Sequence, residues 1–183
     1  MASQRSMRIE EMESDGNCLF RAVAYQVYGE QDMCYLLRER CMEYVLASRD
    51  YFKDFIDTTI DGSIELYCQR KSQDKVWGDD LEIEALSEIY GRPIEIYAYS
   101  SEPMRTFHEQ ADENQAQQPI RISYHGRNHY NAVVRQDFHP DRDKYTKSLP
   151  GDLENQALQM AQEQATTNCG ATSAQEEVKS SSE

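Results

Sequence analysis

The segment DGNCLFRAV, at residues 15–23, decides how the first half of this chain folds. Leucine, alanine and valine side chains recur at helical spacing from Cys18 onward, and Gly29 follows as a natural C-terminal stop. This pattern predicts a helix over residues 18–28 whose first turn holds a cysteine. A thiol in that position lies at the positive end of the helix dipole, close to unpaired backbone N–H groups, and both favour the thiolate. Cys18 is therefore a candidate nucleophile.

The residues just before Cys18 predict a set of hydrogen-bond donors beside the sulfur. Gly16 can adopt backbone angles that are closed to other residues, so the loop can turn its N–H groups inward. We expect the backbone N–H groups of Gly16, Asn17 and Cys18 to stabilise a negatively charged oxygen that develops next to the thiol. The alternative is a structural cysteine beside an ordinary Asp-Gly turn, because an unpaired cysteine is among the most buried residue types.

A second candidate element is the segment HYN at residues 129–131, far along the chain from the cysteine. It begins the stretch HYNAVVR, which predicts a strand. Residues two apart share one face of a strand, so His129 and Asn131 point the same way and Tyr130 points away. An asparagine amide can accept a hydrogen bond from one ring N–H and leave the other nitrogen to take a thiol proton. The alternative for His129 is a hydrogen bond to a neighbouring carbonyl of the sheet.

The remaining elements place helices first and strands last. Further helices are predicted over 32–45 with Asp32 as cap, over 51–56, over 63–70, and over 81–90 with Asp79 or Asp80 as cap and Gly91 as its end. From Pro93 the apolar period changes to two, which predicts strands over 93–100, 119–125 and 129–135 and a short one over 104–108. This order indicates an α+β fold with a small antiparallel or mixed sheet, because alternating βαβ units are missing from the pattern.

A change in composition divides the chain near Pro140. Dense apolar periodicity gives way at that point to Gln, Ala, Thr, Ser and Glu. We expect a folded domain over 1–140 and an acidic Gln/Ser-rich tail over 141–183. A short helix capped by Asp152 is predicted in the tail, and the rest of the tail is predicted to be disordered.

The formal net charge of -14 disfavours some classes of partner. Affinity for nucleic acid and for anionic membranes comes mainly from Lys and Arg, so we expect neither partner. No stretch reaches the roughly 18 apolar residues of a membrane-spanning helix, and the first residues lack a secretory signal. Five cysteines without a CxxC pair favour free thiols in a reducing compartment, the cytosol or nucleus, and give little support for a metal site.

Trp77 and the acidic helix that follows it each have two interpretations. The indole either anchors a helix to the sheet or stands in a binding cleft, and packing is favoured because tryptophan is highly buried on average. The carboxylates of residues 79–88 either form a solvated helix face or recognise a basic partner.

Three ordered blocks of this sequence resemble one family. DGNCLFRAV at 15–23, the WG at 77–78 followed by EIEALSEIYGRPIEIY, and the closing ISYHGRNHYNAVV at 122–134 are similar to the OTU (ovarian tumour) cysteine proteases, which are deubiquitinating enzymes. The resemblance runs from about Met7 to about Val134. The segments YQVYGEQDM and YSSEPMRTFHE place the chain closest to the DUBA-type branch of that family.

The resemblance implies a papain-like α+β OTU fold, with helices packed around a small twisted central sheet and the catalytic domain over 1–140. It implies a thiol hydrolase that cleaves the isopeptide bond between the ubiquitin C-terminus and a lysine. The implied partners are ubiquitin and polyubiquitin chains, bound by a monomeric catalytic domain without cofactor or metal. The alternatives are a ubiquitin-binding module with weak catalysis and a protease for another ubiquitin-like modifier.

By position, the resemblance makes Cys18 the nucleophile and His129 the general base. Asp15 matches a residue that belongs to the active site in this family, and Asn131 matches the usual position that orients the histidine. The sequence leaves open which of these two holds the imidazole; geometry favours Asn131, with Asp15 shaping the loop. Because the ubiquitin tail carries arginines, we also expect acidic side chains along the groove that leads to Cys18.

Overall fold

The computed structural model describes residues 6–108, 118–126 and 128–140. Strands in these ranges form one sheet in the order β1-β5-β4-β2-β3. Their bounds are β1 Met7–Glu10, β2 Ile94–Tyr97, β3 Arg105–Phe107, β4 Ile120–His125 and β5 His129–Arg135. β2 and β4 run parallel and the other neighbours antiparallel, so of the two predicted alternatives, an antiparallel or a mixed sheet, the structure has the mixed one.

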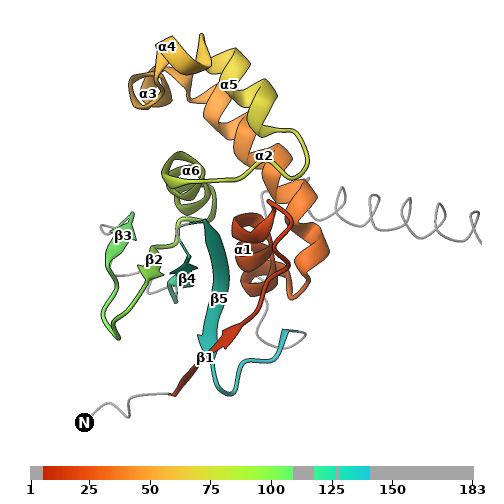
Figure 1. The fold of residues 1–183 in the computed structure, drawn as a ribbon, viewed down its shortest axis with the longest axis vertical. Coiled ribbons are helices and arrows are strands. Elements are labelled where there is room, and N and C mark those ends of the chain that lie inside the picture. The colour runs from red at the N-terminus through yellow and green to blue at the C-terminus, as the bar shows by residue number, and fades with distance from the viewer. Residues whose placement is uncertain (1–5, 109–117, 127, 141–183) are drawn as a thin grey trace, which may run out of the picture. The chain divides into compact units, whose positions relative to one another are not determined.

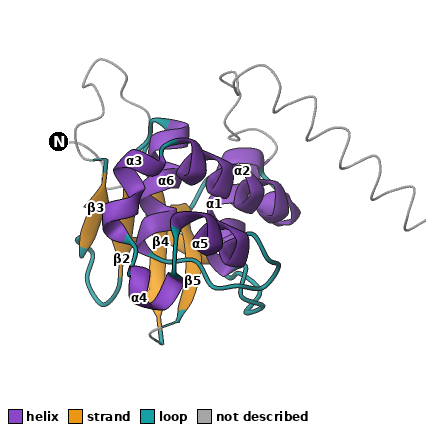
Figure 2. Ribbon diagram, turned by 90° about the horizontal axis from the view of Figure 1, so that it is seen from above, coloured by secondary structure: helices purple, strands orange, loops and turns teal. Residues whose placement is uncertain are grey.

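The helices come before the strands β2 to β5, as the sequence predicts. They are α1 Cys18–Tyr28, α2 Cys34–Ala47, α3 Arg49–Phe52, α4 Thr58–Asp61, α5 Ile64–Lys71 and α6 Asp80–Tyr90, with 3-10 turns η1 Gln31–Met33 and η2 Lys53–Phe55. Helices α1 and α6 pack against the sheet, as Figure 2 shows, and α3 to α5 lie at the other end of the domain from β1 (Figure 1). This arrangement is the expected α+β fold.

The main core lies between α1 and the sheet. Alternation along β4 and β5 turns one set of side chains towards the helix, and these are almost fully buried: Ile120, Ile122, Ala132 and Val134. Leu19, Val23 and Val27 form the matching buried face of α1. Gly29 ends the helix in the left-handed conformation, with its N–H bonded to the Tyr25 carbonyl. This packing fixes the start of α1 beside the start of β5.

Two predictions about local structure were incomplete or wrong. Strand β1 was not predicted, because four residues with a half-exposed pattern carry too little periodicity, and its pairing with β5 stabilises it instead. Asp32 does not cap α2: it lies in the preceding 3-10 turn, and its carboxylate accepts a hydrogen bond from Arg21 at 3.2 Å. Asp79 does occupy the cap position of α6, and Gly91 ends that helix. The predicted tail over 141–183 lies outside the described residues.

Candidate active site

Cys18 is the first residue of α1 and is 2% exposed. Burial raises the pKa of its thiol, while hydrogen bonding with the backbone of Tyr130 and of Leu19 acts in the opposite direction. The net effect differs from the expectation that the helix terminus alone would favour the thiolate. The thiol is therefore protonated at neutral pH, and it needs a base. Its contact with Tyr130 places it next to the strand residue that follows His129.

The imidazole of His129 is held by Asn131. His129 Nε2 lies 2.9 Å from Asn131 Oδ1, so the two side chains share a face of β5, as their spacing predicts. The same oxygen accepts a hydrogen bond of 2.8 Å from the backbone N–H of Met12. A backbone N–H can only donate, so this contact identifies the amide oxygen, and Nε2 must then carry the proton that it donates.

This tautomer leaves Nδ1 of His129 as a proton acceptor. Nδ1 is buried and has no hydrogen-bond partner among the described residues. Buried polar atoms are almost always paired, so an unpaired one at this place indicates a chemical role. An imidazole with one nitrogen held and the other free can act as a base towards a thiol, and the Cys18 thiol contacts the backbone of the next strand residue, Tyr130.

Asp15 contacts the loop and α1, and no described contact joins it to His129. Its carboxylate accepts hydrogen bonds from Arg21 Nη2 at 2.8 Å and from the Asn17 backbone N–H at 2.9 Å. Burial acts to raise the pKa of Asp15, but the hydrogen bonds from Arg21 and Asn17 outweigh it and lower the pKa to about 2. Asn131 is thus the residue that contacts the imidazole of His129, whereas Asp15 holds the loop before Cys18.

The loop before Cys18 has two free backbone donors where three were expected. Because Asn17 donates its N–H to Asp15, that group is not available to an oxyanion, which corrects the sequence-based expectation. In the part of the chain that the structure describes, the N–H groups of Gly16 and Cys18 donate to no backbone or side-chain oxygen, and the Cys18 N–H faces its own thiol. Gly16 has φ +91°, and a Cβ there would lie 2.0 Å from the Lys75 carbonyl oxygen. Only glycine fits this position without a shift of the loop.

Three residues that hold this loop were missed by the sequence analysis. Arg38 donates to Asn17 Oδ1 at 2.6 Å, Lys75 donates its backbone N–H to the same oxygen at 3.3 Å, and Asp74 accepts from Asn17 Nδ2 at 2.8 Å. Of the three, only Arg38 could have been found from the sequence. It shares helical spacing with Cys34, Cys41 and Val45, which places its charge on the buried face of α2.

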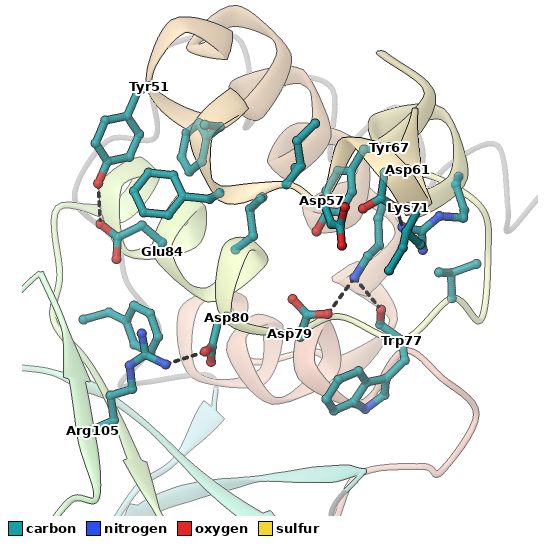
Figure 3. A pocket seen from close by; sticks show the side chains of 18 residues that line it. Tyr51, Asp57, Asp61, Tyr67, Lys71, Trp77, Asp79, Asp80, Glu84 and Arg105 are labelled. Atoms are coloured by element: carbon teal, nitrogen blue, oxygen red, sulfur yellow. Dashed lines mark hydrogen bonds and ion pairs between the residues drawn. The ribbon is translucent and has the colours of Figure 1, made fainter. Parts of the chain in front are cut away.

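Trp77 packs against the strand that carries the histidine. Its ring stacks on Tyr130 with centroids 5.6 Å apart, and its Nε1 donates to the Asn128 carbonyl at 2.8 Å. It also lines a groove of about 720 Å³ between α6, β3 and the helices α3 to α5 (Figure 3). Trp77 therefore packs on the sheet and also borders a groove, and its role in a binding cleft stays a prediction. The acidic side chains of this groove are Asp57, Asp61, Asp79, Asp80 and Glu84.

A family model described as OTU-like cysteine protease matches residues 13–130. The chain belongs to this family. In Arabidopsis thaliana, OVARIAN TUMOR DOMAIN-containing deubiquitinating enzyme 6 is 47% identical over 130 residues, which are 71% of this chain and 25% of that protein. OTU domain-containing protein 5 of Homo sapiens is 40% identical over 139 residues, which are 73% of this chain and 23% of that protein. The chain thus spans about a quarter of the length of these relatives.

Solved OTU domains share the fold. The OTU domain of OTUD1 has a TM-score of 0.60 at 27% identity, covering 70% of this chain and 85% of that one. An Ovarian Tumor (OTU) domain in complex with ubiquitin has a TM-score of 0.58 at 24% identity, covering 74% of this chain and 73% of that one, and shows the fold alone. The DUBA-type branch stays a prediction. In the described ranges, no His, Cys, Asp and Glu cluster could hold a metal, and no helix is long and apolar enough to span a membrane.

Proposed function

We propose that this chain is a deubiquitinating cysteine protease that hydrolyses the isopeptide bond between the C-terminus of ubiquitin and a lysine. The observation that carries the proposal is the imidazole of His129, fixed by Asn131 through Nε2 and unpaired at its buried Nδ1, on a strand whose next residue, Tyr130, contacts the Cys18 thiol at the N-terminus of α1 through its backbone. Two comparisons support it: one relative is named a deubiquitinating enzyme, and one solved OTU domain is bound to ubiquitin.

The mechanism starts with proton transfer. Nδ1 of His129 takes the proton of Cys18, and Asn131 Oδ1 holds the resulting imidazolium through its Nε2–H. The thiolate attacks the terminal carbonyl carbon of ubiquitin, and the carbonyl electron pair moves onto oxygen. That oxygen accepts hydrogen bonds from the N–H groups of Gly16 and Cys18. Asp15 keeps Asn17 turned away from this site.

The second half restores the enzyme. The C–N bond breaks as the intermediate collapses, and the imidazolium gives its proton to the leaving lysine amine. His129 then removes a proton from water, which attacks the thioester carbon. The C–S bond breaks with its electron pair passing to sulfur, and the thiolate of Cys18 takes the proton from the His129 imidazolium. The carboxylic acid formed on ubiquitin gives its proton to solvent and leaves as the carboxylate.

A ubiquitin carrying a C-terminal electrophile tests the proposal directly. We expect this probe to label Cys18, and Cys18→Ala to lose labelling and turnover while still binding ubiquitin. Cys34, Cys41 and Cys68 are free and buried, so they serve as internal controls within the same chain. Labelling of another thiol with Cys18 left untouched would refute the role of Cys18. If only probes built on another ubiquitin-like modifier labelled Cys18, the substrate would be conjugates of that modifier instead of ubiquitin.

A further inference from the structure

Arg38 is a buried cation whose hydrogen bonds all go to uncharged oxygens. It lies in α2 with 2% of its surface exposed. Nη2 donates to the Gly16 carbonyl at 3.2 Å and to Asn17 Oδ1 at 2.6 Å, and Nη1 donates to the Lys71 carbonyl at 2.8 Å. The guanidinium also lies 4.3 Å from the ring centre of Phe20.

Stability alone is a poor explanation for this arginine. Burial lowers its pKa, which means that the charged form is disfavoured at this place, and the charges of Glu82 and Asp74 act against that effect without a hydrogen bond. Burying a charge that has no hydrogen-bonded carboxylate is unfavourable, and apolar residues of similar volume are often neutral or stabilising replacements. The contacts of Arg38 therefore point to a role in the loop that they hold.

Those contacts fix the peptide between Gly16 and Asn17. The described chain has no cis peptide, so the Gly16 carbonyl and the Asn17 N–H point in opposite directions. Arg38 binds the carbonyl on one side, and Asp15 accepts from the N–H on the other. Both ends of one peptide plane are thus held. The Gly16 N–H belongs to the peptide before this plane and the Cys18 N–H to the peptide after it. Each is joined to the fixed plane through the φ and ψ of one residue, Gly16 or Asn17, so a shift of the plane moves both donors.

We propose that Arg38 is a positioning residue that aims the Gly16 and Cys18 N–H groups at the oxyanion of the reaction, an inference that rests on the proposed function. Arg38 does not touch the substrate, since it is enclosed by α1, α2 and the loop. It acts through the Gly16 carbonyl and the Asn17 amide. The largest influences on the pKa of Cys18 are burial, backbone hydrogen bonds and the charge of Asp15, and the charge of Arg38 is not among them. We therefore expect a change at Arg38 to affect the oxyanion step more than the ionisation of the thiol.

Two reactions of the same thiol separate these roles. Turnover of ubiquitin with a fluorogenic C-terminal amide passes through an oxyanion, whereas alkylation of Cys18 by iodoacetamide is a displacement at carbon and forms none. We expect Arg38→Met and Arg38→Lys to lower kcat on the order of 10²-fold, with KM within about threefold. The rate of Cys18 alkylation and its pH profile should match the wild type. Lysine keeps the charge but cannot span both loop oxygens and the Lys71 carbonyl, and it gives the decisive result if Arg38→Met fails to fold.

Gln26→Met is the matched control in the full chain. Gln26 is 7% exposed and donates to the Ala22 and Arg121 carbonyls near the other end of α1, so its loss removes buried hydrogen bonds away from the loop. It should lower thermal stability and leave kcat unchanged. Wild-type kcat in both Arg38 variants, a parallel fall in alkylation, or an equal kcat loss in Gln26→Met would overturn the role of Arg38. A wild-type chain that is alkylated at Cys18 but does not turn over ubiquitin would instead overturn the proposed function.

Discussion

The strand that carries His129 and the loop that leads to Cys18 reach their geometry by different means. On the strand, two residues spaced by two share a face, and one outside contact from Met12 completes the pair. On the loop, a left-handed glycine is enclosed by segments from α1, α2 and the stretch before α6. The strand side thus follows from a local rule, and the loop side depends on distant parts of the chain. Changes to the loop should therefore be the more damaging ones.

Gly16→Ala should cause the largest loss. The new Cβ would overlap the Lys75 carbonyl, and the φ of +91° is strained for alanine. We expect kcat to fall on the order of 10²-fold or more, because both oxyanion donors move with the loop. The free energy of unfolding should fall by more than the roughly 1–2 kcal/mol that a left-handed backbone alone costs. Turnover and urea denaturation measure the two effects.

Gly91→Ala provides the comparison for that variant. Gly91 has φ +55°, and an added Cβ would meet nothing within 4 Å. It should lose about 1–2 kcal/mol through backbone strain and keep its kcat. An equal fall in kcat for the two glycine variants would show that the loop has no special sensitivity.

Asn131→Ala tests the strand side, and its effect should be somewhat smaller. Loss of the amide removes the acceptor for His129 Nε2 and for the Met12 N–H. The imidazole can then rotate and change tautomer, so we expect kcat to fall by about 10- to 100-fold, with KM little changed. Ser87→Ala removes another buried side-chain hydrogen bond, to the Glu84 carbonyl, and should leave kcat intact. If Asp15→Ala abolished turnover while Asn131→Ala did not, the imidazole would be oriented by Asp15.

Asp15→Asn should affect stability more than catalysis. The folded pKa of about 2 lies below the ordinary value near 3.9, so the ionised carboxylate stabilises the fold at neutral pH. This contribution, about 2 kcal/mol, is fully present above the unfolded pKa and is lost as pH falls through the folded pKa. Asp15→Asn should therefore be destabilised at pH 7, and the difference should shrink between about pH 4 and pH 2. Urea denaturation across that range is the measurement, and a gap that stayed constant would contradict the assignment.

The two sides also differ in how well the sequence predicts them. Periodicity predicts α1, its end at Gly29 and the shared face of His129 and Asn131, because each depends on neighbours in the chain. It does not predict strand β1, whose stability comes from pairing with β5. Nor does it predict that the Asn17 N–H donates a hydrogen bond to the Asp15 carboxylate, since hydrogen bonds between loop groups depend on the folded backbone.

Arg38 is a second case in which the sequence does not predict the contacts of a residue near the site. Helical spacing indicates that the Arg38 side chain faces the core, but this spacing does not predict which groups its guanidinium contacts. The partners are Gly16 and Asn17, 22 and 21 residues away, and only packing of α2 against α1 brings them together. The reacting residues and the pairing of His129 with Asn131 were predictable, whereas the residues that hold the Cys18 loop from α2 were not.

The smallest expected effect concerns the groove of Figure 3, which Trp77 borders and whose carboxylates outnumber its basic side chains, Arg70, Lys71 and Arg105. Asp57→Asn removes one groove charge and keeps the oxygen that accepts from the Thr59 N–H at the start of α4. If this groove attracts the arginines of the ubiquitin tail, kcat/KM should fall about twofold at low salt, and the difference should vanish near 1 M salt, where screening shortens to about 3 Å. Asp50→Asn, an exposed α3 residue that does not line the groove, should change neither value. Salt weakens attraction between exposed charges. If kcat/KM of the wild type did not depend on salt, the carboxylates of this groove would play no part in binding ubiquitin and would contribute to solubility only.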